Sequence, residues 1–359
     1  MSVQQFHLAV RPPGAGGPVI PAPLDQLDQL DRFDRLARLA RAAERGRFDF
    51  LLLAETAPPA PPGPEVLTAL STLAAATTRL GLAAGVGPAA HQPYELARRL
   101  ASLDHLSEGR AAWSVTTGPD GAAAAGGLRH GSPPPDADRD AHAAEFLRAA
   151  RTLWDSWAED DVPADPAEGA FVRPGAGAFA HRGAHFDLAG RFTTPRAPQG
   201  HPVVVRTVTA PRDLASAAAD ADVLVVPYTG LAEARELRRD LADRLAAHGR
   251  SPQDLRVLTT LTHALADTSA ADAPAAEVAD VAGTPEQVAD TLTAYVRGGG
   301  SDGFLLTPYA APDALDAFVD RVVPLLQAEA LHRTEYTGPT LRDHLGLAQA
   351  RRPSREATA

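Results

Sequence analysis

The chain contains no cysteine among its 359 residues. This absence excludes disulfide bonds, thiolate metal sites and cysteine nucleophiles, and it is typical of proteins from a reducing compartment. A concentrated group of basic residues is also missing, and the formal net charge is −11. We therefore expect no nucleic-acid partner, because neutralising phosphates requires clustered basic side chains. The ligand should be a small molecule.

Long apolar runs are absent as well. No run approaches the roughly 18 residues that a membrane-spanning helix needs, and the start MSVQQFHLAV lacks the features of a secretory signal. We expect a cytoplasmic protein with no membrane partner. With 45% hydrophobic and 22% charged residues, the chain can bury a large core, as one large α/β domain or as two.

Short apolar runs recur along the chain, with helical periodicity between them. Eight runs have the length of a strand, namely residues 6–10, 48–55, 80–87, 110–117, 201–208, 221–228, 255–265 and 302–309. Nearly continuous hydrophobic strands that alternate with helices are typical of a parallel sheet covered on both faces. Eight of them predict a closed (β/α)8 TIM barrel. An open doubly wound sheet is the alternative, although the first strand lacks a glycine-rich dinucleotide-binding turn.

The interval between the fourth and fifth predicted strands is unusually long. Residues 119–200 hold the helical pattern RDAHAAEFLRAARTLWDSW and a stretch rich in proline and glycine that ends in HRGAHFDLAGRF. In a barrel, an insertion at this point lies over the C-terminal face, where it can form a lid. We predict one barrel domain over residues 1–345 that includes this insertion, and a disordered tail over residues 346–359.

Two motifs suggest other chemistry but lack the context that this chemistry requires. The pattern GGSDG at Gly299–Gly303 matches a serine-hydrolase motif, yet it follows a helix and precedes a strand, the reverse of a nucleophile elbow. His181 and His185, with Asp187 beyond, suggest a metal site. Glycines break this segment, so the two histidines do not share a helix face. We expect ordinary loop hydrogen bonds and no metal.

Several side chains lie where barrel enzymes keep functional groups, after the carboxyl ends of strands. Glu55 ends the second predicted strand, and His91 lies in the loop after the third. A pair of partly solvated loop residues is the alternative interpretation. Trp113 in the fourth strand is more typical of core packing than of a stacking platform.

The segment RLGLAAGVGPAAHQPYELARRLASLDHLSEGRAAWSVTTG resembles the signature of the bacterial-luciferase-like flavin monooxygenases. The resemblance is to the branch that contains nitrilotriacetate monooxygenase and dibenzothiophene-sulfone monooxygenase. It continues, in the family's order and over nearly the whole chain, through RAARTLWDSW, HRGAHFDLAGRF, APQGHPVVVR, GTPEQVADTL, GGGSDGFLL and HRTEYTGPTLRDHLGL.

This resemblance implies a barrel that binds reduced FMN from a separate flavin reductase and uses O2 to oxidise a small organic substrate. The flavin would carry the chemistry, while the protein excludes water and orients the substrate. Pairing of subunits into a homo-oligomer is implied too. Resemblance and position together assign the FMN site to Glu55, Gly85, Gly87, Ser114, Thr116, Thr117, Arg206, Thr207, Thr209 and Ala210. They assign the substrate pocket to His91, Trp113, Tyr228 and Tyr309, and they identify no catalytic residue.

The chain departs from the family where the phosphate of FMN should bind. Asp136, Asp140, Val208 and Asp213 occupy usual flavin-contact positions, where relatives carry hydrogen-bond donors. Each carboxylate would disfavour a phosphate by about 1 kcal/mol or more at an effective dielectric near 20. A loop without glycine and serine also offers fewer N–H and O–H donors.

We therefore predict an eroded phosphate site with weak FMN binding, in which Arg206 and Arg212 are the cations expected to offset the added charge. One alternative remains open, a flavin-independent descendant of the family that uses the cavity to bind a ligand or as a cofactor-free catalyst. A deazaflavin in place of FMN has no motif to support it.

Overall fold

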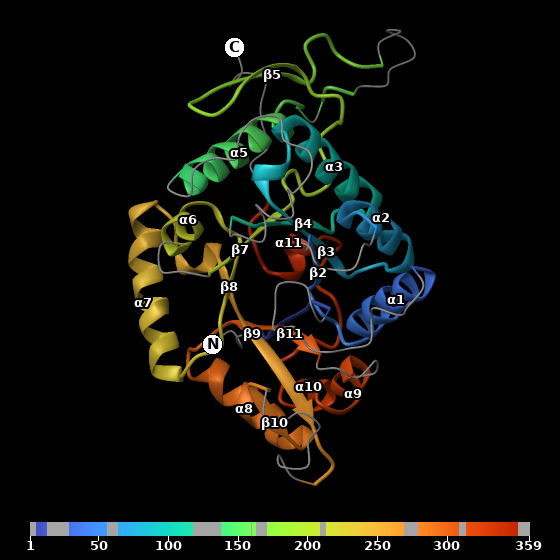
Figure 1. The fold of residues 1–359 in the computed structure, drawn as a ribbon, viewed down its shortest axis with the longest axis vertical. Helices are drawn as coiled ribbons and strands as arrows, with labels where there is room; N and C mark the ends of the chain where they lie inside the picture. The colour runs from blue at the N-terminus through green and yellow to red at the C-terminus, as the bar shows by residue number, and fades with distance from the viewer. Residues whose placement is uncertain are drawn as a thin grey trace.

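Eight parallel strands close into a barrel that helices surround (Figure 1). The computed structural model describes residues 5–12, 29–55, 64–117, 138–158, 160–162, 171–208, 213–268, 279–308 and 314–350. The strands are β1 (His7–Val10), β2 (Phe50–Ala54), β3 (Gly81–Val86), β4 (Ala111–Val115), β7 (Val203–Thr207), β8 (Val223–Val226), β9 (Arg256–Leu265) and β11 (Gly303–Pro308). Each pairs in parallel with the next, and β11 pairs with β1. The eight predicted strands and the closed barrel are confirmed.

The helices form the outer layer. They are α1 (Gln29–Arg45), α2 (Val66–Ala76), α3 (Pro93–Leu106), α5 (Arg139–Trp154), α6 (Asp213–Asp220), α7 (Leu231–Ala247), α8 (Pro285–Arg297), α9 (Ala314–Arg321) and α10 (Val323–Ala328). The short helix α11 (Leu341–His344) lies instead at the amino end of the barrel, where Leu341 joins the inner core. Local chemistry sets their ends. For example, α8 begins after Thr284 because Thr284 and Gln287 each accept the other's backbone N–H, which forms a capping box. No helix within the described ranges is long and apolar enough to cross a bilayer.

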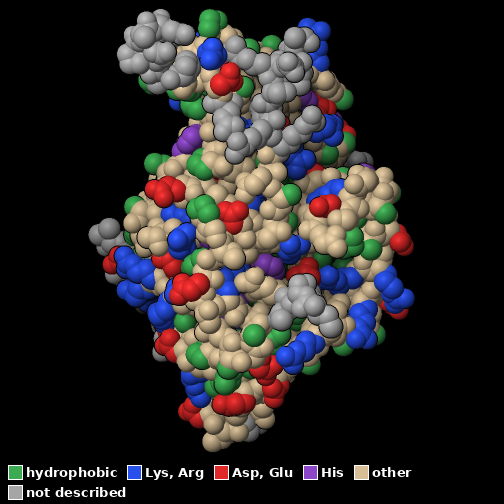
Figure 2. Space-filling view, turned by 180° about the vertical axis from the view of Figure 1, so that it is seen from behind, with side chains coloured by type: hydrophobic (Ala, Val, Ile, Leu, Met, Phe, Trp, Pro, Cys, Tyr) green, Lys and Arg blue, Asp and Glu red, His purple; other side chains and the backbone are tan. Residues whose placement is uncertain are grey.

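Two layers of apolar side chains stabilise the barrel. Alternate residues of the strands point to opposite sides, so Phe50 and Leu52 of β2 pack inside the barrel while Leu51 and Leu53 pack under the helices. The surface is mixed in charge, and on the face seen from behind, basic and acidic side chains lie side by side (Figure 2). Exposed pairs such as Arg45 with Asp316 stabilise the fold little.

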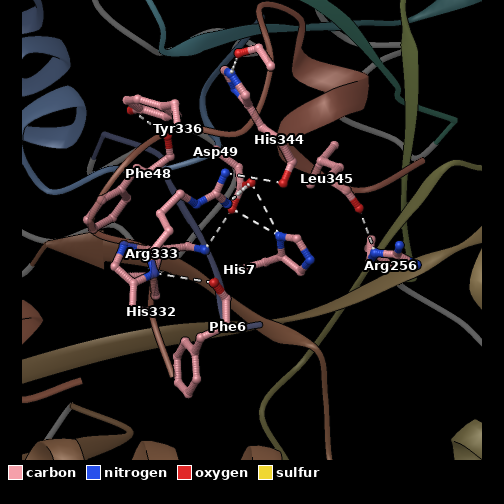
Figure 3. Close-up of polar contacts among 12 residues, drawn as sticks. Phe6, His7, Phe48, Asp49, Arg256, His332, Arg333, Tyr336, His344 and Leu345 are labelled. Atoms are coloured by element: carbon pink, nitrogen blue, oxygen red, sulfur yellow. Dashed lines mark hydrogen bonds and ion pairs between the residues drawn. The ribbon is translucent and has the colours of Figure 1, made fainter. Parts of the chain in front are cut away.

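The C-terminal segment closes the amino end of the barrel. Leu341, Leu345 and Leu347 join the inner core. Beside them Arg333 forms a buried ion pair with Asp49 and donates to the carbonyl oxygen of His344 at 3.2 Å, as Figure 3 shows. Burial alone would raise the pKa of Asp49, but Arg333 and then His7 hold that pKa well below its usual range. Leu347, which lies in the predicted tail, is thus buried, and residues 351–359 lie outside the described ranges.

The insertion after β4 contains the predicted helix, α5, and a hairpin that the sequence analysis did not predict. Strands β5 (Ala178–Arg182) and β6 (Asp187–Arg191) pair in antiparallel fashion. The short strand β10 (Val281–Gly283) extends the sheet beside the carboxyl end of β9. The insertion therefore covers part of the barrel with ordered structure.

The buried side chain of His263 predicts how the stability of the fold changes at low pH. His263 on β9 is 2% exposed and packs against Phe318, with its ring near the backbone of Ala314. Within the described ranges, neither ring nitrogen makes a hydrogen bond of normal geometry. Burial lowers the pKa of His263 from 6.5 to about 4. Because the unfolded chain binds this proton first, stability falls as pH drops below 6.5 and levels off below about 4.

We expect His263→Leu to reduce this acid sensitivity. Urea unfolding should show that the variant gains more stability over the unaltered protein at pH 5 than at pH 7.5. The variant no longer has a group that must be neutral in the folded state. An equal difference in unfolding free energy at both pH values would contradict this explanation.

Candidate functional site

The carboxyl ends of β2, β3 and β4 meet in one row of residues. Ala54 lies opposite Gly85, and Gly85 lies opposite Ser114. The backbone N–H of Glu55 donates to the carbonyl oxygen of Gly85 at 2.9 Å, which places Glu55 at the same mouth. Thr207 ends β7, the next strand around the barrel. The register thus brings together Glu55, Gly85, Ser114 and Thr207.

A carboxylate and an imidazole contact each other at this mouth. His91 Nε2 lies 3.3 Å from Glu55 Oε1. His91 is placed by the short helix η2 (Pro88–Ala90), which follows β3 and precedes α3. Glu55 Oε2 is buried and has no hydrogen-bond partner among the residues that the structure describes. An unpartnered buried acceptor is costly, so a ligand that donates an N–H or O–H there would be favoured.

A narrow pocket lies where the insertion meets the barrel; most of its lining is apolar, and we call it the polar pocket after its four polar side chains. Its lining is Pro88, Ala89, Thr116, Thr117, Arg139, His142 and Ala143. Thr116 and Thr117 follow β4, while Arg139 and His142 come from the first turns of α5. Burial, and then the neighbouring His185, lowers the pKa of His142. Two hydroxyls, a guanidinium and an imidazole are a donor set that suits an anion.

Two of the predicted site residues point away from this mouth. Trp113 is fully buried, donates from Nε1 to the carbonyl oxygen of Val86 at 3.0 Å, and packs against Phe146 of α5. Arg206 forms an ion pair with Asp220, through two hydrogen bonds of 2.7 and 3.0 Å. Arg206 therefore does not offset negative charge at the mouth, and Trp113 packs in the core.

The other residues that the sequence predicts near the flavin or the substrate lie on several different elements. Gly87 precedes η2, and Tyr228, just after β8, lies with its ring 5.2 Å from that of Tyr295. Val208 donates its N–H to the carbonyl oxygen of Val225. Asp140 and Asp213 lie in the first turns of α5 and α6. Five residues predicted at or near the site lie outside the described ranges, namely Asp136, Thr209, Ala210, Arg212 and Tyr309.

The serine of the hydrolase-like pattern and the two histidines of the insertion make ordinary hydrogen bonds. Ser301 Oγ donates to the carbonyl oxygen of Gly303 at 2.9 Å, in the turn before β11, and so it lies on no nucleophile elbow. His181 and the backbone of His185 hydrogen bond to Glu145. Among the described residues, no group of histidines and carboxylates could hold a metal ion.

Comparisons with known proteins agree with this barrel fold. A model of the luciferase-like monooxygenase family matches residues 5–279. The chain belongs to this family. Relatives that it resembles include N-acetyl-S-(2-succino)cysteine monooxygenase of Bacillus subtilis, 30% identical over 84% of this chain and 87% of that protein. Dibenzothiophene-sulfone monooxygenase of Rhodococcus erythropolis is 32% identical over 79% of each.

Nitrilotriacetate monooxygenase component A of Aminobacter aminovorans is 29% identical over 85% of this chain and 88% of that protein. This relative and the sulfone monooxygenase confirm the resemblance seen in the sequence. Two solved structures share the fold, each at 23% identity. A riboflavin lyase superimposes with a TM-score of 0.83 over 96% of each chain, and an EDTA monooxygenase from Chelativorans superimposes at 0.82 over 96% of this chain and 99% of that one. The chain is thus an enzyme of the luciferase-like monooxygenase family.

The row at the mouth of this luciferase-like barrel has no room for a larger residue at Gly85. A Cβ atom at Gly85 would lie 2.6 Å from the Cβ of Ala54. We expect Gly85→Ala to destabilise the fold by about 1–3 kcal/mol, because overpacking forces the strands apart. Thermal unfolding should show a lower Tm. Gly230→Ala is the matched control, since nothing lies within 4 Å of its added Cβ. Equal Tm values for the two variants would contradict the packing account.

Proposed function

We propose that the protein is a monooxygenase that uses reduced FMN and O2 to oxidise a small organic substrate. The observation that supports this most strongly is the polar pocket of Thr116, Thr117, Arg139 and His142 beside the mouth of a luciferase-like barrel. Its donors suit the phosphate of FMN. Glu55 Oε2, which accepts no hydrogen bond from the described part of the chain, suits an N–H or O–H of the same ligand. The residues present thus fit the cofactor.

We assign Arg139 as the cation that binds the phosphate, supported by Thr116 and Thr117. The sequence has no lysine, so every permanently charged cation of the chain is an arginine. Arg139 is the arginine that lines the pocket, beside both threonines. A guanidinium can donate two hydrogen bonds to a phosphate at once, which gives orientation as well as affinity.

Bound FMN would supply the electrons that activate O2. The protein's contribution is to bind, to orient and to exclude water. Ser114, 5% exposed at the end of β4, offers a hydroxyl beside the barrel axis, and the apolar residues below it exclude water. His91 Nε2 and Glu55 Oε1, 3.3 Å apart, can hold a proton between them at the mouth.

If Arg139 binds the phosphate, replacing it should weaken the binding of FMN but not the binding of riboflavin. Arg139→Gln should weaken the binding of FMN about tenfold or more, which corresponds to about 1.4 kcal/mol of binding free energy. The affinity for riboflavin, which has no phosphate, should stay within about twofold. Fluorescence titration measures both affinities. Arg148→Gln is the control, because Arg148 is exposed on the same helix. Equal losses for FMN and riboflavin, or none, would refute the assignment.

We also propose that this chain binds FMN more weakly than its relatives do. Asp140 and Asp213 each place a carboxylate in the first turn of a helix, where it competes with a phosphate for the same backbone N–H groups. Replacing both, as Asp140→Tyr with Asp213→Gly, should strengthen FMN binding in the same titration. No gain in affinity would show that these carboxylates do not weaken the site.

Three further proposals concern partners and location. We propose a separate flavin reductase, because FMN must be reduced before it activates O2 and the first strand is followed by no dinucleotide-binding pattern. A cytoplasmic location and pairing of subunits stay predictions. Complete failure to bind FMN, oxidised or reduced, would instead favour a flavin-independent descendant of the family.

A further inference from the structure

The tip of the β5–β6 hairpin is held by one buried carboxylate. Glu145 of α5 is 3% exposed. Its two oxygens accept the backbone N–H of His185 at 3.1 Å, and Oε1 also accepts that of Phe186 at 2.8 Å. His181 Nε2 lies 3.4 Å from the same oxygen. Burial would raise the pKa of Glu145, but the N–H donors of Phe186 and His185 hold it below its usual range.

The hairpin is shaped to admit this carboxylate. A Cβ atom at Gly183 would lie 2.1 Å from Glu145 Oε1, so only glycine leaves room for the contact. The base of the hairpin has its own anchor, because Tyr94 donates from its hydroxyl to the carbonyl oxygen of Arg191 at 3.2 Å. Loss of the Glu145 contact would therefore loosen the tip and leave the base attached.

The tip in turn holds the first turns of α5. The ring of His185 lies 5.4 Å from that of His142, and His185 Nε2 lies 3.7 Å from the carboxylate of Asp138. The ring of Phe186 lies 4.9 Å from His142 and 5.6 Å from Phe146. His142 thus contacts the tip and also lines the polar pocket.

We propose that Glu145 is a positioning residue for the anion pocket, because it docks the hairpin tip that holds His142 and Arg139 toward Thr116 and Thr117. The proposal rests on the proposed function, in which this pocket binds the phosphate of FMN. Glu145 itself lies among the tip residues and is not part of the pocket lining. Its effect on binding is therefore indirect.

Glutamine is the sharpest replacement for Glu145. An amide keeps the shape of the carboxylate, but with its oxygen in the place of Oε1 its NH2 group would face the backbone N–H of His185. The negative charge that strengthens the bonds from His185 and Phe186 would also be lost. Gly183→Ala disturbs the same contact by a different change, because the carboxylate stays intact and the added methyl group displaces the tip. The two variants should have the same effect, and their combination should add little.

We expect Glu145→Gln and Gly183→Ala to weaken FMN binding about tenfold while riboflavin binding changes less than about twofold. Both should also speed trypsin cleavage after Arg182 in the exposed tip. Hydrogen exchange of residues 139–143 should quicken in protein without flavin. A role in stability alone would lower the affinities for FMN and riboflavin together or would leave both unchanged.

Glu44→Gln is the matched control. Glu44 Oε1 also accepts three backbone N–H groups, those of Thr78, Arg79 and Leu80, but it does so before β3 at the amino end of the barrel. This variant should lose stability without changing the ratio of FMN to riboflavin affinity. A similar change in that ratio for Glu44→Gln would show that the effect is general destabilisation.

Two results would overturn the proposal. One is a tip that opens to trypsin in Glu145→Gln while the ratio of FMN to riboflavin affinity stays the same. The other is a variant in which neither the cleavage at Arg182 nor the exchange of residues 139–143 changes. Unaltered protein that binds no FMN would refute the proposed function instead, and the exchange data would then decide whether Glu145 positions α5.

Discussion

The pairing of β1 with β11 is the constraint on which the rest of the structure depends. Four residues of β1, His7 to Val10, lie opposite Gly303 to Leu306, and this ladder joins the first and last strands of the barrel. Because all eight strands run parallel in a closed ring, their carboxyl ends meet at one mouth. Residues as distant in sequence as Glu55 and Thr207 thereby come to surround one space.

The two ends of this ring have different chemistry. The amino end is sealed by leucines of the C-terminal segment and by the buried ion pair of Arg333 with Asp49 (Figure 3). The carboxyl end keeps polar groups instead, with Ser114, the Glu55–His91 contact and the pocket beside α5. A sealed amino end supports the fold, whereas an open polar end can bind a ligand. The hairpin of the insertion packs against α3 and α5, and Glu145 fixes how its tip meets α5.

The barrel could be predicted from the sequence because each strand is a nearly continuous apolar run, which is the pattern of a strand buried on both faces. The β5–β6 hairpin was missed because its strands are largely exposed and carry glycine and charged residues. The alternation of side chains along a strand explains why Trp113 and Arg206 point away from the mouth. Ala112 lies inside the barrel, so Trp113 points outward, and Val205 lies inside, so Arg206 points outward.

Arg139 and His142 were not predicted because the pocket combines α5 with residues that follow β4 and β3, and no short motif spans these segments. Their spacing of three residues on one helix was the available signal. The most direct test of the account is a crystal structure of the protein with FMN, reduced under anaerobic conditions. The account predicts the flavin ring at the barrel mouth beside Ser114, with its phosphate within hydrogen-bond distance of the Arg139 guanidinium. A flavin bound elsewhere, or an empty mouth at saturating FMN, would contradict it.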